Sequence, residues 1–304
     1  MDNNLNKTLI AVCGPTATGK TAIGIQLARY FHTEIISADS RQFYKEMEIG
    51  TAKPSAEELA LVPHHFINSN SIHDRVSVAD FEKAALEKLE ELFQIYNVVL
   101  VVGGSGLFLQ AIYQGFDDLP ETSLDNREKW NQLYQDFGLS YLQEQLKIFD
   151  PDYYQQVDLQ NPQRIIRALE VSSSNEKPFS AFLTQNKKPR PFNIIKIGIN
   201  PERSVLYNRI NQRVDLMVQN GLIKEVQELL PYQHLNSLNT VGYKELFEAF
   251  NQNTTVKEAL EKIKQNTRRF AKRQITWFKK DQQIRWFDTA NLEPILDYLL
   301  QLIG

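Results

Sequence analysis

The sequence predicts an α/β fold in which a parallel sheet is flanked by helices and interrupted by a helical insertion. The first hundred residues alternate short apolar runs with amphipathic stretches, which is typical of strand–helix–strand units. From about Phe116 the chain becomes rich in aromatic and acidic residues and loses its strand-like runs. A strand-like run returns at Asn193–Ile199, so we expect the first domain to resume there.

The periodicity of apolar residues predicts the individual elements. Buried strands are expected over residues 8–13, 34–37 and 97–102. Helices are expected between them, over residues 21–31 and 79–96. After Asn193–Ile199 the remainder is expected to be helical, over residues 202–220, 223–230, 242–250 and 256–280. The predicted domains are a core of residues 1–116 and 193–304 and an insertion of residues 117–192.

Composition excludes several classes of protein. The 304 residues are 42% hydrophobic and carry a net charge of −3, which suits a globular chain and excludes a disordered or fibrous one. No apolar run is long enough for a membrane span, and residues 1–7 are polar, so a cytoplasmic protein without a membrane partner is expected. The single cysteine, Cys13, lies in an apolar run and is expected to be buried. The five histidines show no metal-ligand spacing.

Residues 14–21 match the phosphate-binding loop pattern, with a predicted strand before them and a predicted helix after them. Backbone N–H groups of such a loop hold the oxygens of a di- or triphosphate. Lys20 would neutralise these oxygens and the Thr21 hydroxyl would ligate Mg²⁺. The motif does not specify which phosphate binds. The expected binding residues are Gly14, Pro15, Thr16, Ala17, Thr18, Gly19, Lys20 and Thr21.

The ends of the other strands differ from those of an ordinary ATPase. The strand over residues 97–102 runs into Gly103-Gly104-Ser105 with no acid to hold Mg²⁺. The acid at a strand end near the expected site is Asp39. This carboxylate would ligate metal or accept a proton, or it would cap a following helix. Because the carboxyl ends of parallel strands share one edge of a sheet, these turns are expected to form one crevice.

The last predicted helix concentrates positive charge. No Asp or Glu lies between Lys262 and Lys280, and aromatic residues are interleaved with the cations. Such a face suits a polyanion such as nucleic acid, although a solvated helix face is the simpler alternative. The cations are Lys262, Lys264, Arg268, Arg269, Lys272, Arg273, Lys279 and Lys280.

Six segments in order resemble the bacterial tRNA dimethylallyltransferases, a family also called tRNA isopentenyltransferases. The resemblance spans essentially the whole chain. It implies a P-loop NTPase-like core, an inserted helical domain that binds tRNA, and transfer of a dimethylallyl group from dimethylallyl diphosphate to N6 of adenosine 37, beside the tRNA anticodon. The segments are residues 14–21, 36–54, 101–107, 163–170, 241–245 and 272–277.

The resemblance also implies roles for individual residues. Asp39 matches the proposed base that accepts the adenine amine proton, and Arg213 matches the arginine that supports the leaving diphosphate. Ser105 and Phe108 stand where the family usually has Thr and Tyr. The residues that match contacts to the tRNA anticodon stem-loop are Asp39, Ser40, Arg41, Gln42, Ser105, Arg127, Gln163, Arg164, Arg167, Thr240, Gly242, Tyr243, Lys244, Lys272, Arg273, Gln274, Trp277 and Lys279.

Two other functions are compatible with the sequence. A phosphate-loop kinase for a small substrate would share residues 14–21, and a non-catalytic RNA-binding module would share the basic helix. The preferred prediction is a monomeric tRNA prenyltransferase with Mg²⁺ as cofactor. An insertion hinged near Phe116 and Phe192 would be able to close on tRNA.

Overall fold

The computed structural model describes residues 7–175, 177–184 and 188–303. The chain separates into two compact units, and each is considered by itself. Unit 1 comprises Met1–Gln114 and Pro189–Gly304, and unit 2 comprises Gly115–Lys188. Among the described residues, no helix combines the length and apolar character needed to cross a membrane.

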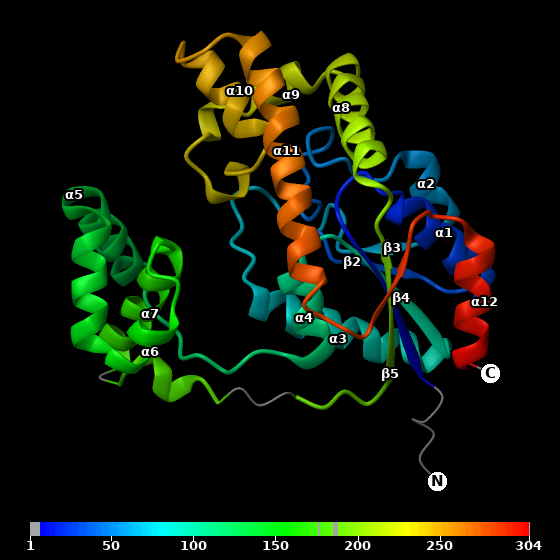
Figure 1. The fold of residues 1–304 in the computed structure, drawn as a ribbon, viewed down its shortest axis with the longest axis horizontal. Helices are drawn as coiled ribbons and strands as arrows, with labels where there is room; N and C mark the ends of the chain where they lie inside the picture. The colour runs from blue at the N-terminus through cyan, green and yellow to red at the C-terminus, as the bar shows by residue number, and fades with distance from the viewer. Residues whose placement is uncertain (1–6, 176, 185–187, 304) are drawn as a thin grey trace. The chain divides into compact units, whose positions relative to one another are not determined.

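Unit 1 is built on a parallel sheet of six strands within the described residues (Figure 1). The strand order is β3-β2-β4-β1-β5-β6, and β1 pairs with β4 on one side and β5 on the other. Apolar β-branched residues dominate the central strands, which are buried on both faces as parallel strands require. The strands are β1 (Thr8–Cys13), β2 (Ile35–Ser37), β3 (His64–His65), β4 (Val98–Val102), β5 (Asn193–Ile199) and β6 (Ile284–Phe287).

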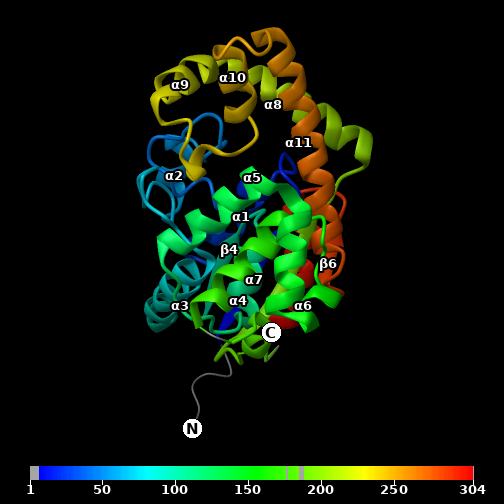
Figure 2. The ribbon, with the colours of Figure 1, turned by 90° about the vertical axis from the view of Figure 1, so that its left-hand side faces the viewer.

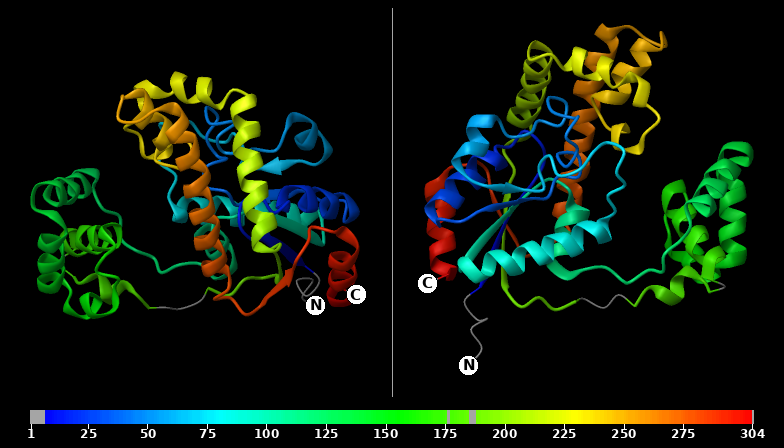
Figure 3. Two further views of the ribbon diagram at one scale, coloured as in Figure 1. Left: turned by 45° about the horizontal axis from the view of Figure 1, so that its top comes forward. Right: turned by 180° about the vertical axis from the view of Figure 1, so that it is seen from behind.

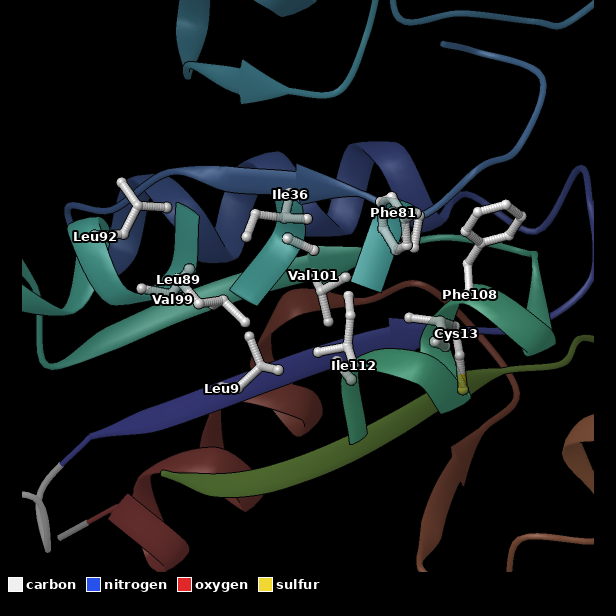
Figure 4. Close-up of a cluster of buried hydrophobic side chains, with 14 of the residues drawn as sticks. Leu9, Cys13, Ile36, Phe81, Leu89, Leu92, Val99, Val101, Phe108 and Ile112 are labelled. Carbon is white, nitrogen blue, oxygen red and sulfur yellow. The ribbon is translucent and has the colours of Figure 1, made fainter. Parts of the chain in front are cut away.

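Helices cover both faces of this sheet (Figure 3). Helices α3 (Val78–Ile95) and α4 (Gly106–Gln114) cover one face, and α1 (Lys20–Tyr30) and α12 (Leu292–Ile303) cover the other. Figure 4 shows the first face, where Leu9, Val99 and Val101 point from the strands toward Leu89 and Ile112. Phe108 packs edge-on against other aromatic rings in this cluster and is almost completely buried.

A helical subregion of unit 1, residues 203–278, occupies the upper part of the view in Figure 2. Its long helix α11 (Val256–Phe278) contacts α8 (Arg203–Gln219), α10 (Tyr243–Phe250) and α4. Apolar residues from this subregion form a cluster of their own around Tyr243 and Met47. The remaining elements of unit 1 are α2 (Ala56–Leu61), α9 (Leu222–Glu228), η3 (Leu230–Tyr232) and η4 (Asn236–Leu238).

Unit 2 is helical and has its own core. Its elements are α5 (Leu124–Phe149), α6 (Pro151–Gln156), α7 (Pro162–Asn175) and η2 (Phe179–Phe182). Trp130, Leu142 and Leu169 are among the residues buried in its core, and α5 packs along α7. Gly138, with φ +77°, interrupts α5, so the helix consists of two pieces joined at a kink.

The α/β class and the strands over 8–13 and 193–199 are confirmed, and the predicted helices agree to within one or two residues. The prediction that everything after Ile199 is helical is wrong, because β6 adds an edge strand beside β5. Cys13 is fully buried as expected, and this burial raises the pKa of its thiol to about 12.

The units divide at Gly115 and Lys188, whereas the predicted insertion was 117–192. Residues 189–192 belong to unit 1 because they are fastened to it. Arg190 donates hydrogen bonds to the carbonyls of Ala111 and Ile112 and forms a 2.8 Å ion pair with Glu82. Its side chain is 8% exposed, so this pair is largely removed from water.

Candidate functional site

A pocket of about 690 Å³ lies at the carboxyl end of the sheet, and all of its lining residues belong to unit 1. The turns that follow β1, β2 and β4 all line it, as the sequence predicted. Helices α8 and α11 supply the lining residues Arg213 and Gln274, which come from much later in the chain.

The phosphate-binding loop joins β1 to α1 in a shape that glycine makes possible. Gly14 has φ +135°, and a Cβ added there would lie 2.5 Å from the carbonyl oxygen of Ile199 in β5. Gly19 has φ +89° and caps the N-terminus of α1. The buried hydroxyl of Thr18 donates to the carbonyl of Pro15 at 3.0 Å, which stiffens the loop.

Two cations point to the same loop. Lys20 Nζ donates to the carbonyl of Pro15 at 2.5 Å, and Arg213 Nη1 donates to the Thr16 hydroxyl at 2.9 Å. Burial, and then the positive charge of Arg213, lower the pKa of Lys20 to about 8, although Asp39 acts in the opposite direction. Burial also lowers the pKa of Arg213. Two partly dehydrated cations beside a loop of N–H donors make a receptor for an anion of multiple charge.

Asp39 follows β2 and lines the pocket. Its Oδ1 accepts a hydrogen bond from the Arg41 N–H at 3.0 Å, and its carbonyl accepts one from the Gln42 N–H at 3.2 Å. Residues 40–43 form a turn, so the alternative that Asp39 caps a helix is wrong. Within the described part of the chain Oδ2 has no hydrogen-bond partner, which leaves one carboxylate oxygen for a ligand.

The turn after β2 is fixed to the turn after β4. The Ser40 N–H donates to Ser105 Oγ at 3.1 Å, and the two hydroxyls lie 3.3 Å apart. The serine in place of the usual threonine therefore still provides a hydroxyl that holds the Asp39 turn.

Arg41 and Gln42 were expected to contact tRNA, but their side chains are engaged within the chain. The guanidinium of Arg41 donates to the carbonyl of Ser237 at 2.7 Å and to two neighbouring carbonyls. Gln42 donates to the carbonyls of Thr51 and Ala52 at 3.3 and 3.1 Å. In this structure both residues fasten the walls of the pocket.

Gln274 and Trp277 show two different environments on α11. Gln274 is 8% exposed; its Oε1 accepts from the Thr16 N–H at 3.0 Å and its Nε2 donates to the Gly104 carbonyl at 2.9 Å. Trp277 is 37% exposed, and its indole lies so close to Gly106 that a Cβ there would be 2.2 Å from the ring. Gln274 therefore belongs to the interior and Trp277 to the surface.

The basic residues of α11 are mostly exposed. Lys264 pairs with Asp215 at 2.8 Å, and Arg268 donates to Asn211 at 2.6 Å, so these two cations are engaged with α8. Arg273 lies 5.8 Å from the ring of the half-exposed Phe270, and both residues line the pocket. Of the cations that the sequence placed on this face, the exposed ones are Lys262, Arg269, Lys272 and Arg273 in α11, and Lys279 and Lys280 directly after it.

The segment before α10 forms another wall. Thr240, Gly242 and Lys244 line the pocket, and the side chain of Lys244 is exposed. The side chain of Tyr243 is fully buried, so the expected contact between this side chain and tRNA is not available in this structure.

A model of the IPP transferase family matches residues 42–281 of the chain. The chain belongs to the IPP transferase family. A protein of Christiangramia forsetii named tRNA dimethylallyltransferase is 53% identical over 296 residues, covering 97% of this chain and 98% of its own. A solved tRNA isopentenylpyrophosphate transferase of Bacillus halodurans superposes with a TM-score of 0.72 at 36% identity, covering 98% of this chain and 97% of its own. A eukaryotic dimethylallyltransferase solved in action on tRNA gives 0.74 at 25% identity, covering 90% and 70%.

In this IPP transferase family member, four expected tRNA-contacting residues lie in unit 2. Arg127 and Arg167 both approach the buried carboxylate of Glu170, at 3.5 and 3.0 Å. Gln163 and Arg164 are exposed at the start of α7. The shared carboxylate holds the two half-exposed guanidinium groups close to one another while leaving N–H groups at the surface.

Metal binding at the phosphate loop would depend on few protein atoms. Among the residues whose placement is described, no group of three or more His, Cys, Asp or Glu side chains could hold an ion. Thr21 lies at the start of α1, lines the pocket, and has a hydroxyl without a hydrogen-bond partner in the described structure. Its hydroxyl therefore fits Mg²⁺ only if diphosphate oxygens complete the coordination.

Sequence reasoning missed Glu225. This α9 carboxylate accepts hydrogen bonds from the N–H groups of residues 48–50, at 2.6 to 3.1 Å, and from the Tyr243 hydroxyl at 2.6 Å. It thereby anchors the pocket-lining segment that begins at Gly50. No local pattern marks Glu225 in the sequence, since its backbone partners lie about 175 residues earlier.

Proposed function

We propose that this chain transfers a dimethylallyl group from dimethylallyl diphosphate to N6 of the adenosine at position 37 of tRNAs, releasing diphosphate. The observation that carries the proposal is the pocket lined together by the phosphate loop, Asp39 and the Arg273 end of α11. These features provide, in order, a binding site for diphosphate, a proton acceptor and a binding surface for RNA. Family membership supports the same reaction.

The leaving group would be stabilised by residues already directed at the loop. Lys20 and Arg213, together with loop N–H groups, would bind the diphosphate oxygens and meet the negative charge that grows as the allylic C–O bond breaks. Lys20 would exchange its bond to Pro15 for one to diphosphate. Thr21 would hold Mg²⁺, which supplies further neutralisation of the diphosphate.

Asp39 would take the proton of the attacking amine. The N6 lone pair forms the new bond to the allylic carbon while the electron pair of the C–O bond leaves with diphosphate. The N6 proton passes to Asp39 Oδ2, because Oδ1 is occupied by the N–H of Arg41. Ser105 keeps this carboxylate in place through Ser40.

The anticodon stem-loop would be held by both units. In unit 1 the exposed cations Lys272, Arg273 and Lys279 would contact phosphates, and Trp277 offers an aromatic surface for a base. In unit 2 the candidates are Arg127, Gln163, Arg164 and Arg167. Extraction of the adenosine from its stack would let N6 reach the pocket. We expect the protein to act as a monomer in the cytoplasm.

One assay tests the proposal against its alternatives. The protein is incubated with unmodified tRNA, Mg²⁺ and either radiolabelled dimethylallyl diphosphate or γ-labelled ATP. Label on tRNA from the prenyl donor, located at adenosine 37 by nuclease mapping, is the expected result. Label from ATP on a small molecule would indicate a kinase instead, and tRNA binding without transfer of either label would indicate an RNA-binding module.

A further inference from the structure

Gln274 joins two parts of the site that are distant in the chain. Its side-chain amide lies between the phosphate loop and the turn after β4, where it accepts from the Thr16 N–H and donates to the Gly104 carbonyl. Both bonds have good lengths, at 3.0 and 2.9 Å, and the side chain is 8% exposed. Its polar atoms are thus used inside the protein.

The neighbours of Gln274 on α11 face outward. Lys272 and Arg273 precede it and are exposed, so the same turn of helix carries cations outside and the amide inside. Thr16 is held from a second side by Arg213, through its hydroxyl. The position of the Thr16 peptide therefore depends on α11 and α8 together.

We propose that Gln274 is a positioning residue, through which the position of α11 determines the position of the phosphate loop. Binding of RNA on α11 and binding of diphosphate in the loop are therefore linked. This inference rests on the proposed function. It differs from the role that the resemblance implies, since both polar atoms of the Gln274 amide already have hydrogen-bond partners within the chain. Linkage is reciprocal: if RNA fixes α11 and thereby tightens diphosphate binding, diphosphate tightens RNA binding by the same factor.

The test measures the dissociation constant of inorganic pyrophosphate by calorimetry, with Mg²⁺, in the absence and presence of saturating unmodified tRNA. For the wild-type chain we expect tRNA to tighten pyrophosphate binding about fivefold or more. For Gln274→Met, which keeps length but loses both hydrogen bonds, we expect this ratio to fall to about one and pyrophosphate binding to weaken roughly tenfold. The affinity for tRNA alone should not change.

A second variant disrupts the contact between Gln274 and Gly104 without altering residue 274. In Gly104→Ala the new Cβ would lie 2.5 Å from Gln274 Nε2, so the flexible amide must move away. This variant should also lower the ratio, and it keeps the test valid if Gln274→Met folds poorly. Gln265→Met is the matched control, because Gln265 is exposed on the same helix.

Each outcome decides the question. A wild-type ratio of one, or an unchanged ratio in both Gln274→Met and Gly104→Ala, would overturn the proposal, even if both variants melt at lower temperature. Weaker binding of tRNA alone by Gln274→Met would instead show that the residue contacts RNA. Failure of the proposed function is recognised separately, since the wild-type chain would then transfer no dimethylallyl group to tRNA.

Discussion

Replacing Asp39 by asparagine separates its chemical role from its structural one. The asparagine side chain would retain an oxygen to accept the Arg41 N–H, which Asp39 Oδ1 now accepts at 3.0 Å, so the turn after β2 should persist. For Asp39→Asn we expect a change in the free energy of unfolding of less than about 0.5 kcal/mol. Asp39→Ala removes the acceptor and should cost about 1 kcal/mol.

Loss of the proton acceptor should lower kcat by about 10²–10⁴, equivalent to about 3–5 kcal/mol in the barrier. Loss of the negative charge has a second effect, because Asp39 raises the pKa of Lys20 and of Arg213. Without this carboxylate the pKa of Lys20, now about 8, falls further, and a neutral lysine would then account for part of the loss.

Single-turnover transfer at saturating tRNA and donor, measured from pH 6 to pH 8, separates the two effects. A defect caused by neutral Lys20 would recover at low pH, whereas loss of the base would not. Asp39→Asn should therefore remain defective across this range. Transfer within about tenfold of wild type at every pH would refute the assignment of Asp39 as the base.

Three further changes have definite expectations. Because the pKa of Lys20 is lowered to about 8, the KM for the prenyl donor should rise as pH increases through that value. Lys20→Arg stays charged and should abolish this pH dependence, so an identical pH profile in both proteins would contradict the role of Lys20. Lys272→Glu should lower the log–log salt slope of tRNA binding by about one unit in filter-binding assays, whereas exposed Lys83→Glu on α3 should not; equal effects would point to a general charge effect. Glu225→Ala should destabilise the fold by about 3 kcal/mol in urea unfolding, since three backbone N–H groups lose their acceptor, and the exposed α9 control Glu228→Ala should be nearly neutral; similar losses would refute the anchoring role.

The pattern of apolar residues along the chain predicted those elements of the fold that are marked by a run of apolar residues. The apolar runs at Thr8–Cys13 and Asn193–Ile199 predicted two central strands correctly, because β1 is buried along its whole length and β5 is buried over its last three residues. Strand β6 was missed, since Arg285 interrupts its apolar character and its pairing with β5 is a tertiary interaction. Strand β3 has two residues and shows no period at all.

In the site, too, features with a local sequence signal were predictable and contacts between distant residues were not. The phosphate loop was predictable because glycine, lysine and threonine are required at fixed spacing. The engagement of Arg41 with the carbonyl of Ser237, and of Gln274 with Thr16, joins residues about 200 positions apart or more, so no sequence window contains both partners. The turn at Asp39 resembled a helix cap because aspartate serves both structures with the same short side chain.

The order in which the chain is synthesised has a consequence for the sheet. Strand β1 is among the first segments made, yet one of its two partners, β5, follows only after all of unit 2. A nascent chain that ends before Asn193 leaves one edge of β1 open, with apolar residues that the finished protein buries completely. Such an edge favours pairing with other chains, so ribosome-bound intermediates of this length are candidates for protection by chaperones. The phosphate loop also lacks one of its packing partners until β5 has been made, because Gly14 packs against Ile199 at the end of β5.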